Sequence, residues 1–486
     1  MSGRISAANI KKTLYYVRRN GIRAAYYAAR ERMEAGYYED YVYNGPSAKE
    51  LKRQREAVWE NSPLISILVP AFHTPEPFLR ALVDSVVQQS YTHWELLIAD
   101  ASGDNNVKRV VQEYPDERIC YIGLSSNEGI SENTNQALEK ARGSYIGLLD
   151  HDDLLTPDAL YEIVCRIEEG RQKGYRVSLI YSDEDKCDQS GTCFYDPHFK
   201  EDFNLDLLLS NNYICHFMVL ESGLLKKLRF RKSCEGAQDY DVALRAAGEL
   251  MDRSCMPPVG ADESKSEDKN EISEKNGKIE PEASIRHIQK VLYHWRCHTG
   301  STAENPRSKE YAYEAGAGAL QDFIRQRGWK AQVCPLKHVG FYGIEYEGSV
   351  LAIRKDIGAV GGRLLADRKI TGGIYRSDGS ILYEGIHEKY SGYMHRAALC
   401  QDADAVDIRC IQVREECHQL FLRITGFPYE KYPGEEIFDY RTLPIGTDYI
   451  SLSLMLGNAL RQAGYRVLWD PRICVQADRK AGQWKK

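Results

Sequence analysis

The sequence predicts an α/β fold in which a mostly parallel sheet is flanked by helices. Short, apolar, β-branched segments alternate with helical segments between residues 63 and 181. The first of them, LISILV at Leu64–Val69, is apolar without alternation, which is typical of a strand buried on both faces. Hydrophobic residues make up 43% of the 486 residues, so the chain can bury a sizeable core.

The expected elements follow one another in a regular strand–helix order. Strands are expected at Leu64–Val69, Glu95–Ala99, Ile119–Ile122, Ser144–Leu149 and Val177–Tyr181. Helices are expected between them at Phe78–Gln89, Asn106–Glu113, Ile130–Ala141 and Pro157–Glu169. In such sheets ligands bind beyond the carboxyl ends of the strands. The residues directly after each strand are therefore the first place to look for a site.

The length suggests two or three domains. Residues 61–346 carry the strand–helix pattern, and residues 347–486 form a further module with glycine-rich turns. Within 261–284, twelve of 24 residues are charged, which predicts a mobile charged insertion over 252–284. Residues 1–60 read as a basic, tyrosine-rich helical region. Such a helix can lie on an anionic membrane or pack on a neighbouring domain; we favour packing slightly, because tyrosine is a good intramolecular anchor.

Composition excludes several classes of protein. Lys plus Arg is 64 and Asp plus Glu is 70, so the net charge of 64 − 70 = −6 argues against a nucleic-acid binder. No uncharged apolar run reaches the roughly 18 residues of a membrane span, and the beginning of the sequence has no apolar signal core. The 13 cysteines include no CxxC pair, which predicts reduced thiols in a cytoplasmic protein.

Acidic residues crowd the end of the fourth expected strand. Asp150, Asp152 and Asp153 lie within four residues, and their mutual repulsion costs free energy unless a cation neutralises it. Mg²⁺ and Mn²⁺ favour one or two carboxylates together with phosphate oxygens. The structural alternative is that these residues cap the helix that begins near Pro157. Capping is plausible for Asp153 but does not account for all three aspartates. The sequence therefore predicts a metal–diphosphate site here.

Three further positions have a functional and a structural interpretation. Asp100, after the second strand, can bond a ribose or base edge, or cap the next helix. Asp239 precedes a helical segment and can serve as a general base or as a helix-end charge; the local sequence does not choose between them. Arg296 and His298 lie in the donor-rich segment YHWRCH, where they suit a phosphate or a metal, or a satisfied core.

Together these segments resemble family 2 glycosyltransferases with the GT-A fold, over about residues 63–345. The resemblance is closest to bacterial cell-wall and O-antigen transferases of the rhamnosyl or rhamnan type, which also share LIYSDEDK and NYICH. The motifs, in order, are ISILVPAF, ELLIADAS, NEGISENTNQALEKARGSYIGLLDHDD, EGAQDYDVALR and LYHWRCHTGST.

The resemblance implies a Rossmann-like nucleotide-binding sheet and a role for each motif. Pro70 and Ala71 would approach the nucleotide through their backbone, and Asp100 would contact its base or ribose. Asp150 and Asp152 match the family's D-x-D, with Asp150 nearer the ribose and Asp152 a ligand of Mg²⁺ or Mn²⁺.

Further motifs of the family are implied to complete the site. Asp239 matches the position of the general base. Arg296 and His298 would face the diphosphate or the metal, with His298 as a second candidate ligand. Residues 347–486 resemble the distal half of a second such module without its nucleotide-binding half, so this module is expected to be non-catalytic, with Asp448 as a relic of a base position.

The implied reaction is an inverting transfer from a nucleotide-diphosphate sugar, such as a UDP- or dTDP-sugar, to a hydroxyl of a cell-surface glycan or lipid-linked acceptor. A nucleotidyltransferase is a weaker alternative. It would need a glycine-rich, basic loop after the first strand, where this chain has PAFHT at residues 70–74. A non-catalytic, carbohydrate-binding or scaffolding relative is the other alternative. The expected location is cytoplasmic, with peripheral contact of residues 1–60 at the inner face of the plasma membrane left open.

Overall fold

The computed structural model describes residues 7–37, 40–254, 284–298 and 310–477. The chain forms two compact units, a central unit (38–203 and 212–323) and a composite unit (1–37, 204–211 and 324–486). These units do not coincide with the expected boundaries after residues 60 and 346, because residues 1–37 and 204–211 belong with the C-terminal region. Most of the expected charged insertion, residues 255–283, lies outside the described residues, as does the GST segment at 300–302.

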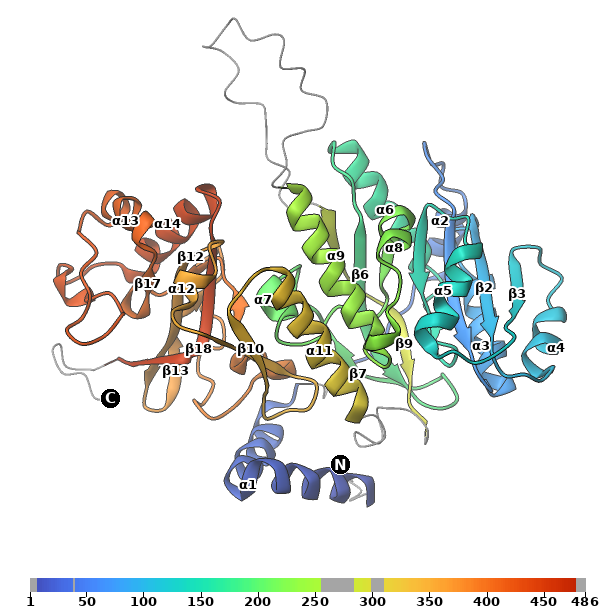
Figure 1. Ribbon diagram of the computed structural model, residues 1–486, viewed down its shortest axis with the longest axis horizontal. Helices are drawn as coiled ribbons and strands as arrows, with labels where there is room; N and C mark the ends of the chain where they lie inside the picture. Colours follow the sequence, from blue (N-terminus) through green and yellow to red (C-terminus); the bar gives the residue numbers. More distant parts are fainter. Residues whose placement is uncertain (1–6, 38–39, 255–283, 299–309, 478–486) are drawn as a thin grey trace, which may run out of the picture. The chain divides into compact units, whose positions relative to one another are not determined.

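The central unit is built on a sheet whose first half follows the sequence prediction (Figure 1). Four parallel strands lie side by side in the order β3-β2-β1-β4. They are β1 (Ile65–Ala71), β2 (Trp94–Asp100), β3 (Ile119–Gly123) and β4 (Tyr145–Leu148). All residues of β2 are buried, and so are all those of β1 except Pro70, as expected of strands covered on both faces.

The second half of this sheet is mixed rather than parallel. Strand β8 (Val219–Glu221) runs antiparallel between β4 and β6 (Leu179–Cys187), and β9 (Ile285–Arg296) is parallel to β6. An antiparallel neighbour needs no helical crossover. The chain before β8 indeed holds the short strand β7 (Phe194–His198) and a single helical turn, α7 (Leu205–Leu208). The short β5 (Leu154–Leu155) completes the sheet on β9.

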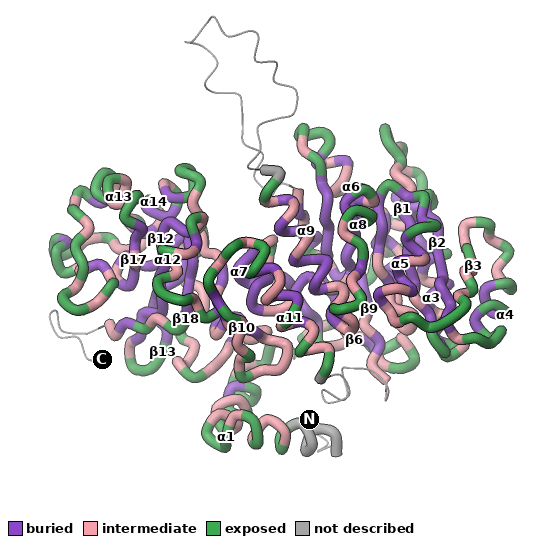
Figure 2. Tube along the Cα trace, in the orientation of Figure 1, coloured by how far each residue is buried: buried purple, intermediate pink, exposed green. Residues whose placement is uncertain are grey.

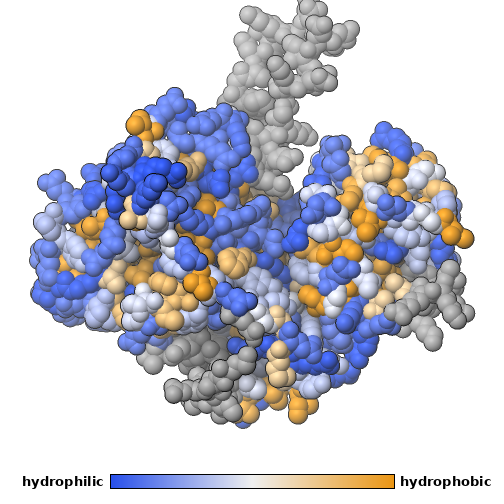
Figure 3. Space-filling view, turned by 180° about the vertical axis from the view of Figure 1, so that it is seen from behind, coloured by the Kyte–Doolittle hydropathy of each residue, from blue (hydrophilic) through white to orange (hydrophobic). Residues whose placement is uncertain are grey.

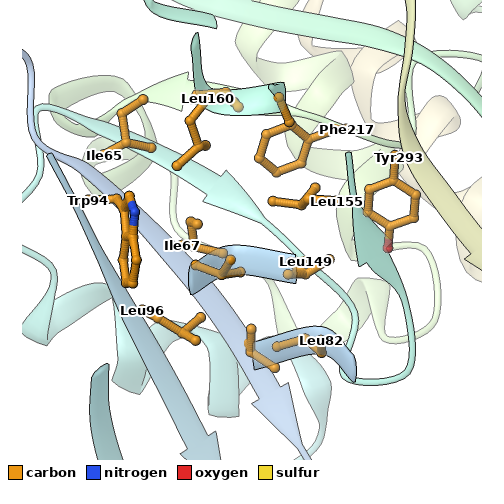
Figure 4. Packing of buried hydrophobic residues seen from close by; sticks show 14 of the residues in the cluster. Ile65, Ile67, Leu82, Trp94, Leu96, Leu149, Leu155, Leu160, Phe217 and Tyr293 are labelled. Atoms are coloured by element: carbon orange, nitrogen blue, oxygen red, sulfur yellow. The ribbon is translucent and has the colours of Figure 1, made fainter. Parts of the chain in front are cut away.

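Helices cover both faces of this sheet. The helices are α2 (Ala48–Arg55), α3 (Glu76–Val87), α4 (Asn106–Gln112), α5 (Ile130–Lys140), α6 (Ala159–Gln172), α8 (Ser222–Leu228), α9 (Gln238–Ser254) and α11 (Glu310–Gln326). Side chains of α3, α4 and α6 share one apolar cluster with β1 and β2. Figure 4 shows part of it, with Ile67 and Leu96 on the same side of the sheet as Leu82 of α3. Helix α5 packs against β1 and β2 on the other face, as right-handed crossovers require.

The composite unit has its own sheet and core. Its strands are β12 (Ile357–Ala366), β13 (Lys369–Gly372), β15 (Gln401–Asp402), β17 (Gln412–Val413) and β18 (Arg466–Gln476). Buried residues of this sheet pack with α13 (His418–Thr425) and α14 (Tyr449–Gln462). The smaller elements are α12 (Val350–Ile353), the pair β14 (Ile374–Tyr375) and β16 (Ala405–Val406), and the hairpin β10 (Ala331–Pro335) and β11 (Tyr342–Tyr346). Each unit thus buries its strands behind exposed turns and helix faces (Figure 2).

Buried polar contacts explain why distant segments belong to the composite unit. Arg354, fully buried, donates two hydrogen bonds to the Asp206 carboxylate at 2.8 and 3.1 Å, a bidentate pair that fixes α7. Glu31 of α1 (Ala7–Ala35) accepts the backbone N–H groups of Ser391 and Gly392. Helix α1 therefore packs on the C-terminal region, within the composite unit.

None of the helices within the described ranges combines the length and the hydropathy needed to cross a membrane. The face shown in Figure 3 is largely hydrophilic, with hydrophobic side chains in scattered groups.

Candidate active site

The structure brings the sequence-predicted residues of three strand ends to one edge of the central sheet. Ala71, the last residue of β1, is paired with Asp100, the last residue of β2, and Pro70 precedes it. The acidic turn 150–153 follows β4 after a single residue, Leu149, and β4 pairs in parallel with β1 on the side opposite β2. Because parallel strands present their carboxyl ends at the same edge, these groups share one face of the molecule.

Asp100 is buried, and both of its carboxylate oxygens are engaged. Oδ1 accepts the backbone N–H of Ser102 at 3.0 Å and its hydroxyl at 2.5 Å, and Oδ2 accepts the hydroxyl of Tyr121 at 3.0 Å. The hydroxyl of Ser102 in turn accepts the N–H of His73 at 2.8 Å, which ties the loop after β1 to the end of β2. Asp100 thus orders the rim of the edge, and Oδ2, which accepts a single hydrogen bond, has a second lone pair for a ligand.

The acidic turn is held in place from two sides. His151 Nδ1 lies 2.9 Å from the hydroxyl of Thr74 in the loop after β1. Asp153, completely buried, accepts the backbone N–H of Arg296 at 2.7 Å and the hydroxyl of Tyr293 at 2.5 Å. Burial, with the neighbouring carboxylates, raises the pKa of Asp153 well above its usual range. Asp153 thus anchors the turn to β9.

Arg296 extends this anchoring. It is buried behind the acidic turn, with 1% of its surface exposed. Its Nε donates to the backbone carbonyl of Asp152 at 2.6 Å, and one terminal nitrogen donates to the carbonyl of Gln189 at 2.8 Å. The guanidinium also lies over the ring of Phe78, with 4.8 Å to the centroid. The other terminal nitrogen is buried with no partner among the described residues, so it has a hydrogen bond to offer.

Asp152 and His298 form the pair best suited to a divalent cation. Asp152 Oδ2 lies 2.8 Å from His298 Nε2, and both side chains are about one-fifth exposed. Ligands at neighbouring corners of an octahedron, each about 2.1 Å from the ion, lie about 3 Å apart. The spacing of this pair, which is that of a hydrogen bond, also matches two ligands of one ion; the carboxylate is a donor that suits Mg²⁺ or Mn²⁺, whereas imidazole is less typical of these ions. Asp150, Asp153 and His216 form a second group, with ligand atoms within 4.8 Å of one another.

Asp150 connects the acidic turn electrostatically to Asp239. Burial raises the pKa of Asp150, His216 lowers it, and the carboxylates of Asp152 and Asp239 raise it further. The contacts agree with this influence, because ligand atoms of Asp150 and His216 lie within 4.8 Å of each other, and the Cys215 thiol contacts both His216 and Asp239. The crowding of negative charge makes this edge a good place for a cation.

Asp239 is the second residue of α9, yet its described hydrogen bonds come from elsewhere. Its Oδ2 accepts Asn212 Nδ2 at 2.8 Å and the thiol of Cys215 at 3.0 Å. Both bonds go to the same oxygen, so Oδ1 keeps its accepting capacity. In the segment EGAQDYD, the acid that caps a helix is Glu235. Its carboxylate accepts the backbone N–H groups of Ile130 and Ser131 at the beginning of α5.

The site contains residues that were not among the predicted candidates. Besides Asn212 and Cys215, His216 stacks on Tyr293 with ring centroids 4.5 Å apart, and Cys215 Sγ lies 3.3 Å from its Nε2. Their signal in the sequence is the segment NYICH, which carries no periodicity of its own.

Nearby, Lys200 pairs with the buried Glu184 at 3.2 Å. Although burial acts against ionisation, this cation holds the pKa of Glu184 well below its usual range.

Carboxylates gathered at the carboxyl edge of parallel strands lie where open α/β sheets bind their ligands. Residues 66–229 match the family described as Glycosyl transferase family 2, and this part of the chain is a glycosyltransferase domain of that family. The α/β fold expected from the motifs is confirmed for the central unit, and the composite unit holds a second sheet of its own.

Two curated relatives match the same part of the chain. The uncharacterized protein y4gI of Sinorhizobium fredii is 39% identical over 277 residues, which are 56% of this chain and 26% of that protein. The O-antigen biosynthesis protein RfbC of Myxococcus xanthus is 30% identical over 275 residues, 56% of this chain and 19% of that protein. The chain therefore matches only about a quarter or less of the length of either relative.

Among solved structures, TarS of S. aureus in complex with UDP-GlcNAc is similar, with 17% identity and a TM-score of 0.38 over 54% of this chain and 66% of that one.

Proposed function

We propose that the chain transfers a sugar, with inversion, from a nucleotide-diphosphate sugar to a hydroxyl of a cell-surface glycan or lipid-linked acceptor. The observation that carries the proposal is that, in a family 2 glycosyltransferase domain, the turn with Asp150 and Asp152 is linked to Asp239 through contacts of His216 and Cys215. The acceptor class is supported by the motif resemblance and by the relative named for O-antigen biosynthesis. A rhamnosyl donor is the first to test.

The donor side of the proposed site is formed by the strand ends. The backbone at Pro70 and Ala71 and the carboxylate of Asp100 would bind the nucleoside, and Asp150 would bind its ribose. Asp152 and His298 would hold Mg²⁺ or Mn²⁺, which supplies positive charge against the departing diphosphate. The partnerless nitrogen of Arg296 would face the same group, while the rest of this guanidinium positions the acidic turn.

Asp239 is the proposed general base. Its Oδ1 would accept the proton of the acceptor hydroxyl while the acceptor oxygen bonds to the anomeric carbon and the bond to the diphosphate breaks. Asn212 and Cys215 fix the opposite oxygen, so that the carboxylate meets the acceptor in a single orientation. A base of this kind contributes roughly 10²- to 10⁴-fold to the rate.

Release of nucleoside diphosphate tests the proposal. The full chain is incubated with Mn²⁺, with a panel of UDP- and dTDP-sugars including a rhamnosyl donor, and with glycan acceptors. Acceptor-dependent release of nucleoside diphosphate supports a glycosyltransferase. A parallel reaction supplies a nucleoside triphosphate and a sugar 1-phosphate, and release of pyrophosphate in that reaction would indicate a nucleotidyltransferase instead. Donor binding without release for every acceptor would favour the non-catalytic alternative.

We also propose that the second half of α1 contacts the inner face of a membrane. Ile22 and Met33 are each 79% exposed and Tyr26 is 59% exposed, although all three are apolar or amphipathic. Their spacing of four and seven residues places them on one helix face after the break at Gly21, and the exposed Arg32 suits anionic lipid. Flotation with anionic but not neutral liposomes is expected, and Ile22→Asp combined with Met33→Asp should abolish it. Unchanged flotation would contradict the contact.

A further inference from the structure

The composite unit contains a cavity of about 550 Å³, which is within the usual size range of small-ligand sites. One wall is the face of α1 that carries Tyr16, Arg23 and Tyr27, and the facing wall comes from the C-terminal region, including His338 and Arg363. Glu31 secures the two walls to each other through Ser391 and Gly392. The cavity lies outside the proposed active site, and the proposed reaction does not use it.

Aromatic rings make up much of the lining. Tyr16 lies against His338 with centroids 5.5 Å apart, and His338 stacks on His395 at 3.5 Å and 16°. Burial lowers the pKa of His338 to about 4 and that of His395 to about 3, so both rings are neutral near pH 7. Tyr27 adds a further ring on α1. Flat, uncharged aromatic faces of this kind attract the slightly positive C–H edges of a partner.

The charged groups of the lining favour an anion. Its acids, Glu31 and Glu388, are both committed, Glu31 to Ser391 and Gly392 and Glu388 to Arg368. By contrast Lys337 and Lys389 are exposed, and neither forms an ion pair with any carboxylate in the described part of the chain.

The most telling group is Arg363. Its side chain lines the cavity and is 8% exposed, and two of its nitrogens donate to the backbone carbonyls of Glu388 and Ala397. Its Nε is buried without a partner among the described residues. A buried donor that is left unsatisfied is costly, and a ligand oxygen would remove that cost.

We propose that this cavity binds an acidic saccharide, with a sugar ring against the aromatic wall and its carboxylate at Arg363, Lys337 and Lys389. A nucleotide fits less well, because the backbone N–H pair of Ser391 and Gly392, which could hold a phosphate, already holds Glu31. The site goes beyond the proposed transfer and does not depend on it, since it concerns the other unit. It gives this module a binding role.

Calorimetry on the full chain, without donor or metal, tests the proposal. Trigalacturonate, a trimer of uronic acids, is the acidic probe, maltotriose is the neutral probe and UDP is the nucleotide probe. Trigalacturonate is expected to bind at least tenfold more tightly than the other two. Lys337→Ala combined with Lys389→Ala should weaken it at least tenfold, because each lysine contributes a charge-assisted contact. Lys355→Ala, an exposed lysine of the same unit outside the cavity, is the matched control and should leave binding unchanged.

Three results would overturn the proposal: equal binding of maltotriose, no effect of the double lysine variant, or tighter binding of UDP that the double variant weakens. Since both lysines are exposed, folding of the variant is not in question, and its thermal midpoint should match that of the control. The outcome is separable from that of the proposed reaction, because loss of nucleoside diphosphate release leaves the calorimetry unaffected.

Discussion

Asp239 and Asp448 occupy comparable places in the two units, near the beginning of a helix, but their surroundings differ. Asp448 is the N-cap of α14, and its carboxylate accepts the N–H of Ser451 at 3.1 Å and its hydroxyl at 2.7 Å. Asp239 is bonded by Asn212 and Cys215, which lie 27 and 24 residues away. A carboxylate bonded to its own helix stabilises that helix, whereas one held by other segments is oriented toward something else.

The largest expected effect is the difference in transfer rate between variants of these two aspartates. Asp239→Asn should lower the transfer rate by about 10²- to 10⁴-fold, because the base is lost, while donor affinity stays nearly the same. Asp448→Asn should leave the rate unchanged. Initial rates of nucleoside diphosphate release and calorimetry with the donor measure both quantities. An equal loss of donor affinity in Asp239→Asn would refute the assignment of the base.

The next effect concerns Asp152 and His298, and it is measured on donor binding. Asp152→Ala should abolish the dependence of donor binding on Mn²⁺, and His298→Ala should weaken it about tenfold, because the ion loses one of its ligands from the protein. Calorimetry with and without Mn²⁺ is the measurement, and Asp378→Ala, a turn carboxylate of the composite unit, is the control. Unchanged metal dependence in both site variants would place the ion elsewhere, for instance at Asp150 and His216.

The positioning of Asp239 gives a smaller effect. Asn212→Ala and Cys215→Ala should each lower kcat by roughly tenfold, the value of one hydrogen bond to a charged group, with the donor KM unchanged. Cys215→Ser retains a donor and should recover most of the rate. A fall in donor affinity in place of kcat would show that these residues only maintain the fold.

The smallest effect concerns stability alone. Hydrogen bonds from the Ser451 side chain and backbone hold the pKa of Asp448 below its usual range. A group whose folded pKa is lowered adds stability above its unfolded pKa of about 3.9 and loses it as pH falls through the folded value. Asp448→Ala should therefore lower the urea midpoint at pH 7, and the difference from the unchanged chain should shrink near pH 2. A difference that is constant with pH would exclude the cap as its cause.

The sequence was sufficient for those parts of the site that follow a strand. Ala71, Asp100 and Asp152 could be placed because an apolar run marks each strand and its end is local information. Asn212 and Cys215 could not, since NYICH has no periodicity and meets Asp239 only through the tertiary fold. The antiparallel β8 was missed for a similar reason: three residues are too few to show a pattern.

The same limit applies to α1. Its amphipathic, basic character is visible in the sequence, but the surface on which it packs is more than 300 residues away. Only the structure indicates that one of its two acids, Glu31, is matched to a pair of backbone N–H groups at Ser391 and Gly392.

That long separation has a consequence for synthesis. The ribosome completes α1 about 360 residues before Ser391 and Gly392 leave it. During this interval the helix keeps its inner face, including Tyr16 and Tyr27, open to chaperones or lipid. We therefore expect α1, although made before the other elements of its unit, to be among the last of them to dock.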